Sequence, residues 1–183
     1  MSRPTHILRH EHRVIEQGLR ALDGMCFKLK LGEPVPPESL TQILDFIRNF
    51  ADHFHHTKEE TYLFPALQEY GIQDEAGPLE FLRNEHETER LLLGELGMAV
   101  EEYRHGDSAA AERFVGAACS FRDHLVGHMQ QEDAILYSLA EEMLDEPVKA
   151  SLLKSFTQEN ARAGELSRRY ERLAGELEQA WAV

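Results

Sequence analysis

The sequence has only two cysteines among its 183 residues, Cys26 and Cys119, and they form no Cys-x-x-Cys motif. A disulfide framework and a thiolate zinc site are therefore not expected. Long apolar runs are missing as well: no stretch approaches the roughly 18 residues that a membrane-spanning helix needs, and the first residues lack the apolar core of a signal peptide. We therefore expect a cytoplasmic protein that has no membrane partner.

Basic residues are scarce. The chain carries 19 lysines and arginines against 33 acidic residues, which gives a net charge of −14. This balance repels phosphate backbones, and no local basic patch interrupts it, so we do not expect a nucleic-acid partner. The length suits one domain with a sizeable core.

Proline and glycine are concentrated in a few places, and the stretches between them carry apolar residues at helical spacing, without strand signals. Pro65 lies inside one of these stretches, where we expect a kink or an early end. The pattern predicts five helices, at about residues 6–31, 39–65, 79–105, 109–144 and 146–181.

Long helices joined by short connectors favour an antiparallel up-and-down bundle. The sequence thus predicts an all-α fold, with a four-helix bundle over residues 1–145. Residues 146–183 are expected to form an additional C-terminal helix that packs on the bundle or on a partner subunit. A monomer and a homodimer are both compatible with this pattern.

The sequence also contains an internal repeat that places histidine and glutamate at matching positions. Two His-x-x-x-Glu pairs occur 73 residues apart, and the Glu-His dipeptides that precede them occur 74 residues apart. Two hairpins of matched length should bring both sets to the same height in the bundle. The repeated residues are His12, His55 and Glu59 in the first half and His86, His128 and Glu132 in the second.

Residues four apart on a helix project from one face, and a carboxylate buried in an apolar core needs a cation or a strong donor. A single His-x-x-x-Glu pair is common on helix surfaces, but two pairs with matched histidines are hard to obtain by chance. Four imidazoles and two carboxylates suit iron, manganese or zinc. We expect two metal ions that share both carboxylates, with His12 and His55 on one ion and His86 and His128 on the other.

These residues resemble the hemerythrin-like family, also called HHE cation-binding domains. The resemblance covers residues 5 to about 145 and rests on Glu11-His12 with Val14-Ile15, Phe50-Ala51-Asp52, His55 through Glu60, Leu63-Phe64-Pro65, Gly77-Pro78, Glu85-His86-Glu87, and His128 through Asp133 with Leu136. It implies a four-helix bundle around an oxo- or hydroxo-bridged centre of two iron ions. Members of the family bind dioxygen or nitric oxide, sense oxygen or iron, handle peroxide, or help to repair iron centres.

The sequence departs from the oxygen carriers of this family at one place. They have a further histidine one turn after the helix position of His86, and this chain has Arg90 there; the matching place after His12 holds Glu16. The resemblance therefore implies a di-iron protein that binds dioxygen, nitric oxide or peroxide for sensing, scavenging or redox chemistry rather than for transport. The alternatives are an enzyme that turns over peroxide or nitric oxide, and a protein that buffers or delivers iron.

Other polar residues near the motifs receive weaker expectations. Glu16 is expected on the surface or in a salt bridge, for instance with Arg90. His124 and Tyr62 lie one turn from predicted ligands and are expected to be mainly structural. Glu60 and Asp133 point away from the ligand direction, so roles beside the ligands or on the surface are expected. The remaining histidines are expected on the surface: His6, His10, His53, His56 and His105.

Overall fold

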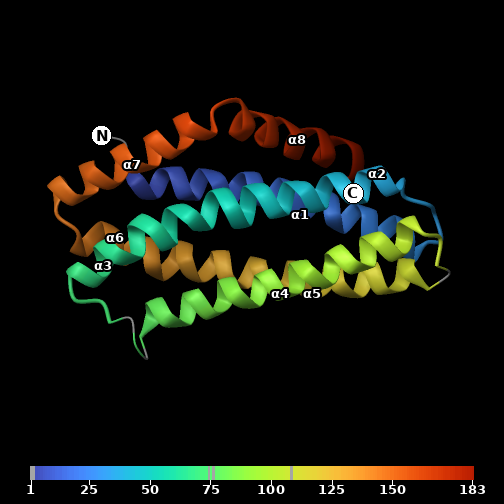
Figure 1. Ribbon diagram of the computed structural model, residues 1–183, viewed down its shortest axis with the longest axis horizontal. Helices are drawn as coiled ribbons and strands as arrows, with labels where there is room; N and C mark the ends of the chain where they lie inside the picture. Colours follow the sequence, from blue (N-terminus) through green and yellow to red (C-terminus); the bar gives the residue numbers. More distant parts are fainter. Residues whose placement is uncertain (1–2, 74, 76, 108) are drawn as a thin grey trace.

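The computed structural model describes residues 3–73, 75, 77–107 and 109–183 (Figure 1). Across these residues every regular element is a helix and no strand occurs, which confirms the all-α prediction. Nor does this part of the chain contain a helix that is long and apolar enough to cross a membrane.

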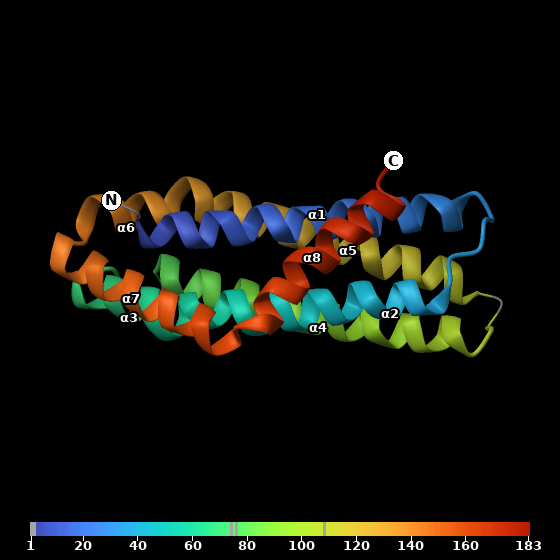
Figure 2. The ribbon, with the colours of Figure 1, turned by 90° about the horizontal axis from the view of Figure 1, so that it is seen from above.

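Four long helical rods run side by side and alternate in direction along the molecule (Figures 1 and 2). The first rod is α1 (Pro4–Lys30), and the third is α4 (Pro78–Arg104). The second and fourth rods are composite and include π-helical segments. The second comprises α2 (Pro37–Phe46), η1 (Ile47–His56), η2 (Glu59–Leu63) and α3 (Phe64–Glu69); the fourth comprises α5 (Ala110–Gln131), η3 (Glu132–Leu136) and α6 (Tyr137–Met143).

The π-helical segments coincide with the repeated motifs. His55 lies in η1, and Glu59 and Glu132 are the first residues of η2 and η3. Such segments are rare and frequently occur at functional sites. Pro65 neither ends nor interrupts the second rod, which continues to Glu69; the change from π- to α-helical geometry falls next to the proline, at Phe64.

Two apolar clusters fill the bundle on either side of these motifs. The apolar residues Leu40, Ile43, Leu44, Ile47 and Phe50 of the second rod are buried, and they pack in the larger cluster with residues of α1, α4, α5 and α8. The smaller cluster joins the C-terminal ends of the two composite rods through Leu63, Phe64, Leu67, Leu136, Tyr137 and Ala140. Apolar packing on both sides holds the polar residues between them in fixed positions.

The single C-terminal helix predicted from the sequence is instead two helices, α7 (Glu146–Ala163) and α8 (Glu165–Trp181). The break falls at Gly164, whose φ of +50° is rarely adopted by a residue with a Cβ atom. Asp145 caps α7 by accepting a hydrogen bond from the Val148 amide at 3.0 Å. Figure 2 shows α7 and α8 lying across the face formed by α1 and the second rod, where Tyr170, Ala174 and Leu177 of α8 are buried.

The end of α8 approaches α1 closely at Gly24, where an added Cβ atom would overlap the carbonyl oxygen of Trp181. We expect Gly24→Ala to displace the last turn of α8 and to lower the free energy of unfolding by about 1–3 kcal/mol. Trp181 is the only tryptophan, so its fluorescence reports this change directly. Gly94→Ala on α4 is the matched control: the space beside Gly94 is open, and the substitution should stabilise the helix by about 0.5–1 kcal/mol. Unchanged stability and emission in Gly24→Ala would contradict this contact.

Candidate metal centre

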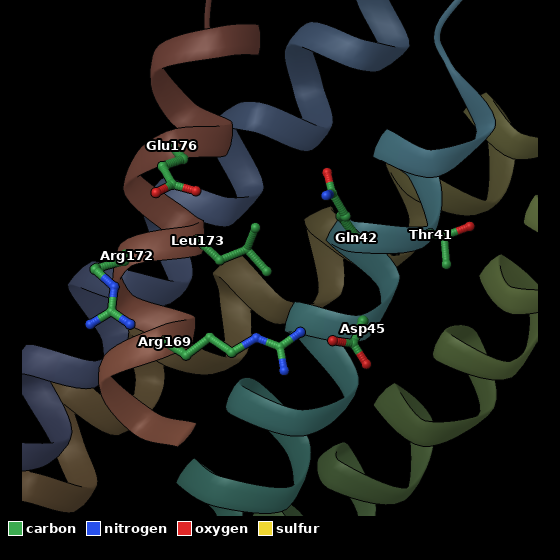
Figure 3. A pocket seen from close by; sticks show the side chains of 7 residues that line it. All are labelled: Thr41, Gln42, Asp45, Arg169, Arg172, Leu173 and Glu176. Atoms are coloured by element: carbon green, nitrogen blue, oxygen red, sulfur yellow. The ribbon is translucent and has the colours of Figure 1, made fainter. Parts of the chain in front are cut away.

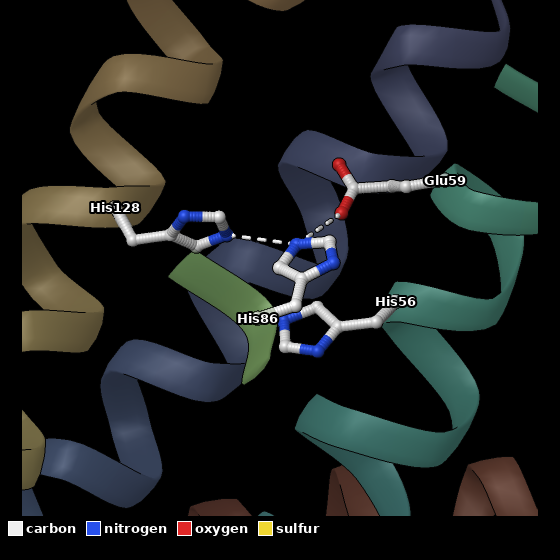
Figure 4. Close-up of side chains that lie close together, drawn as sticks. All are labelled: His56, Glu59, His86 and His128. Atoms are coloured by element: carbon white, nitrogen blue, oxygen red, sulfur yellow. Dashed lines mark hydrogen bonds and ion pairs between the residues drawn. The ribbon is translucent and has the colours of Figure 1, made fainter. Parts of the chain in front are cut away.

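The six histidines and glutamates predicted from the repeat lie together inside the bundle. Each composite rod supplies one His-x-x-x-Glu pair, and α1 and α4 supply one histidine each. Each of these side chains is at most 2% exposed. Together with His56 they form two groups whose donor atoms lie close enough to hold metal ions. The first group contains His12, His55 and Glu132; the second contains His56, Glu59, His86 and His128, which Figure 4 shows converging from different helices.

The imidazoles pair within each half of the repeat, with their Nε2 atoms facing each other. The Nε2 atoms of His12 and His55 are 3.0 Å apart, and those of His86 and His128 are 3.1 Å apart. Two donors that each lie about 2.1 Å from one ion and about 90° apart are separated by about 3.0 Å. The spacing of each pair therefore suits a shared ion.

Both carboxylates lie between the two imidazole pairs. Glu59 Oε2 is 3.8 Å from His55 Nε2 and 3.5 Å from His86 Nε2. Glu132 Oε2 is 3.3 Å from His12 Nε2, and its Oε1 is 3.2 Å from His128 Nε2. Each carboxylate thus reaches both pairs, as a bridging ligand must.

Three carboxylate oxygens in this centre are buried and accept no hydrogen bond from any residue that the structure describes: Glu59 Oε2 and both oxygens of Glu132. Leaving a buried carboxylate without a strong partner is costly. Mixed imidazole and carboxylate donors suit iron, manganese or zinc. The donor set therefore fits two divalent cations.

The charges of the centre also favour cations. Burial raises the pKa of Glu132, but His128, His12 and His86 together lower it well below its usual value, so this carboxylate stays charged. Burial lowers the pKa of His86, yet Glu132, Glu59 and Glu60 raise it to about 12. Burial lowers the pKa of His55 to about 3, which leaves it neutral and able to bind metal. Without metal, protons on imidazoles balance the carboxylates, so metal binding must release protons.

Acidic residues next to the motifs contact the outer nitrogens of the imidazoles. Glu60 Oε1 lies 2.6 Å from His86 Nδ1, and Asp133 Oδ1 lies 3.2 Å from His12 Nδ1. Glu11 Oε2 lies 3.0 Å from His55 Nδ1. Such contacts orient an imidazole so that Nε2 faces the metal, and they increase its basicity.

Arg90 lies at the edge of the centre and contacts carboxylates other than Glu16, which is exposed. Its guanidinium is 2.8 Å from both Asp52 and Glu60 and 2.7 Å from Glu87, so the suggested pairing with Glu16 is wrong. Burial raises the pKa of Glu60, but His86 and Arg90 lower it to about 2. Arg90 thereby keeps Glu60 ionised beside His86.

His56 is the residue that the sequence pattern placed wrongly. It was expected on the surface, but it is 1% exposed and stacks on His86 with ring centres 3.8 Å apart. Its Nε2 lies 3.4 Å from Glu89 Oε2. The cause lies in η1: π-helical turns rotate each residue by less than the roughly 100° of an α-helix, and over nine residues this brings His56 toward the face of Ile47.

Two further buried polar residues, Glu89 and Lys58, carried no signal in the repeat. Burial raises the pKa of Glu89 to about 7, and its Oε1 lies 3.8 Å from His128 Nε2. The Lys58 ammonium lies 3.0 Å from Glu11. Their burial could have been suspected only from the helical register of the second and third rods.

The remaining residues considered from the sequence lie outside both groups. His124 is half-buried, and its Nε2 lies 3.2 Å from the carbonyl oxygen of Glu85. The Tyr62 hydroxyl donates a hydrogen bond to Glu159 on α7 at 2.6 Å rather than to a residue of the centre. The other four histidines expected on the surface are exposed: His6, His10, His53 and His105.

The cavities differ in their relation to the centre. A groove of about 450 Å³ lies between α2 and α8, and none of its lining residues belongs to either metal group (Figure 3). An apolar cavity of about 90 Å³ is lined in part by Leu82 and Leu136, one helical turn from His86 and from Glu132 respectively. None of the residues that line this cavity belongs to either metal group, whereas a third cavity, of about 10 Å³, is lined in part by His56 and Glu89.

Comparison with known proteins gives one family. The model of the hemerythrin HHE cation binding domain matches residues 3–115 and again residues 79–183. Uncharacterized proteins of Mycobacterium bovis and of two strains of Mycobacterium tuberculosis are 22% identical over 155 residues, which cover 85% of this chain and 60% of theirs. The chain thus spans about 60% of the length of these curated relatives. No solved structure matches the chain significantly.

Proposed function

Because the chain belongs to the hemerythrin HHE cation binding domain family, we propose that it is a non-haem di-iron protein. Its six repeated residues hold two iron ions, joined by an oxo or hydroxo group, and the centre binds dioxygen, nitric oxide or peroxide. Its role is sensing, scavenging or redox chemistry.

The position of the two carboxylates between the two imidazole pairs carries this proposal. His12 and His55 would hold one ion and His86 and His128 the other, since Glu59 and Glu132 each lie within 3.8 Å of both imidazole pairs. When bound, two iron ions supply open coordination positions and a source of electrons. Among divalent metals, mixed imidazole and carboxylate donors with open positions suit iron.

The protein's own residues orient and enclose the centre. Contacts from Glu11, Glu60 and Asp133 hold three imidazoles, and the flanking apolar clusters exclude water. Arg90 occupies a place where the oxygen carriers have a ligand, and its cation is held by Asp52, Glu60 and Glu87. The place that supplies a further imidazole in a carrier therefore supplies none here, which supports sensing or redox chemistry over transport.

Turnover of peroxide or nitric oxide is the second candidate, and the position of Glu89 favours it. This buried carboxylate lies beside His128 and His56 without belonging to the six repeated residues, and its Oε1 accepts no hydrogen bond within the described part of the chain. A carboxylate so placed is available for proton transfer to or from a bound small molecule. A protein that buffers or delivers iron would use the same centre but would not need a carboxylate for proton transfer.

Metal analysis followed by stopped-flow absorption tests the proposal. We expect about two iron ions per chain after anaerobic loading, given two sets of donors. Mixing the reduced protein with dioxygen, nitric oxide or peroxide should give a long-lived adduct if the centre binds a ligand, or repeated consumption of the oxidant if it is an enzyme. Loading below one iron ion per chain would contradict the proposal, and loading without any reaction would favour buffering.

A further inference from the structure

Each half of the centre has an aromatic ring at the same position, and the two rings differ by one hydroxyl group. Phe64 and Tyr137 each follow the repeated glutamate of their own half by five residues. Phe64 stacks on His86 with ring centres 5.8 Å apart, and Tyr137 stacks on His12 with ring centres 5.4 Å apart. An arginine covers each ring, since Arg83 lies 5.0 Å from the Phe64 ring and Arg9 lies 5.3 Å from that of Tyr137.

The extra hydroxyl makes a specific contact in the centre. Tyr137 is fully buried, and its hydroxyl donates a hydrogen bond to Glu59 Oε1 at 2.6 Å. It also lies 3.2 Å from His12 Nε2. Hydrogen bonds from a hydroxyl to a carboxylate are among the strong ones in proteins. On the opposite side Phe64 has no hydroxyl, and both oxygens of Glu132 lack a hydrogen bond within the described part of the chain.

We infer that Tyr137 is a positioning residue that makes the two bridging carboxylates unequal. Its hydroxyl donates a hydrogen bond to Glu59 Oε1, so Glu59 offers the metal ions one free oxygen, Oε2, whereas Glu132 offers two. The inference rests on the proposed function, because it requires that metal ions bind between the imidazole pairs. It adds that one coordination position on the Glu59 side stays open for a small ligand next to the Tyr137 hydroxyl.

The inference predicts that one substitution destabilises the metal-free protein more than the metal-loaded protein. In the metal-free protein, Tyr137→Phe leaves Glu59 Oε1 buried without a donor, and the unfolding equilibrium constant should rise about 10- to 100-fold. In the loaded protein the freed oxygen can bind a metal ion, which offsets much of this loss. Metal should therefore bind more tightly to Tyr137→Phe than to the wild type.

Zinc is the appropriate probe because it undergoes no redox reaction and accepts the same donors. The experiment measures the zinc dissociation constant and stoichiometry by calorimetry, and chemical unfolding with and without zinc. Tyr62→Phe is the matched control, because Tyr62 donates a hydrogen bond of the same 2.6 Å length to Glu159, away from the centre. The expected result is tighter zinc binding in Tyr137→Phe and unchanged zinc binding in Tyr62→Phe.

Two results would overturn the inference. Equal destabilisation of the metal-free and the zinc-loaded protein would show that Tyr137 only packs in the core. Weaker zinc binding in Tyr137→Phe, with a tyrosinate absorption band in the loaded wild type, would make Tyr137 a ligand rather than a hydrogen-bond donor. Failure of the proposed function has a different signature, since the wild type itself would then bind less than one zinc ion per chain.

Discussion

The Glu132→Gln variant is expected to lose most of its capacity to bind metal. Glu132 is the residue whose two oxygens reach both imidazole pairs, with Oε2 3.3 Å from His12 and Oε1 3.2 Å from His128. Glutamine keeps the shape but removes the charge and replaces one oxygen with an amide nitrogen, which does not bind metal. Removing even a residue that only supports a ligand typically weakens metal binding 10- to 100-fold, so the loss of a bridging ligand should exceed about 100-fold. Iron content after loading and desalting measures this effect.

Glu16→Gln is the control for this experiment. Glu16 is an exposed carboxylate on α1, one turn after His12. It holds the position in the first half of the repeat that Arg90 holds in the second. Its substitution should leave the iron content unchanged. The unfolding midpoint of each metal-free variant shows whether the bundle is intact. Normal iron loading in a folded Glu132→Gln protein would exclude Glu132 as a bridging ligand.

The helical spacing of the repeat was sufficient to predict the bundle and to bring six residues together. His12 and His86 meet their partners because two hairpins of equal length place them at the same height, and the structure shows Nε2 atoms about 3 Å apart in each pair. That these six residues bind metal stays a prediction. The division of the chain at residue 145 stays one as well.

Features that depend on local departures from the α-helix could not be predicted. The burial of His56 follows from the π-helical turns of η1, which a pattern of 3.6 residues per turn does not contain. The C-terminal break follows from the positive φ of Gly164, and glycine alone does not reveal its own φ in a sequence. Two of the three partners of Arg90, Asp52 and Glu60, lie on the second rod, so these contacts depend on tertiary packing that sequence spacing does not contain.

Lys58 is a buried cation that the repeat does not predict. Its removal should have the largest effect on stability. Its side chain is fully buried, and its ammonium lies 3.0 Å from Glu11 Oε1, donates a hydrogen bond to the Phe54 carbonyl at 3.1 Å, and sits 3.1 Å from the centre of the Phe54 ring. Burial raises the pKa of Glu11 to about 7 even though Lys58 lowers it. Lys58 thus holds the Glu11 carboxylate in place, and this carboxylate contacts His55.

Lys58→Met should lower the free energy of unfolding of the metal-free protein by about 3–5 kcal/mol, because it leaves the Glu11 carboxylate buried without its cation. Adding Glu11→Gln should recover part of this loss, since it removes the unpaired charge. Lys154→Met on the exposed face of α7 is the control and should change stability by less than about 0.5 kcal/mol. If the double variant is no more stable than Lys58→Met, the ammonium acts through Phe54 packing rather than through Glu11. Urea unfolding of the four proteins at one pH separates these outcomes.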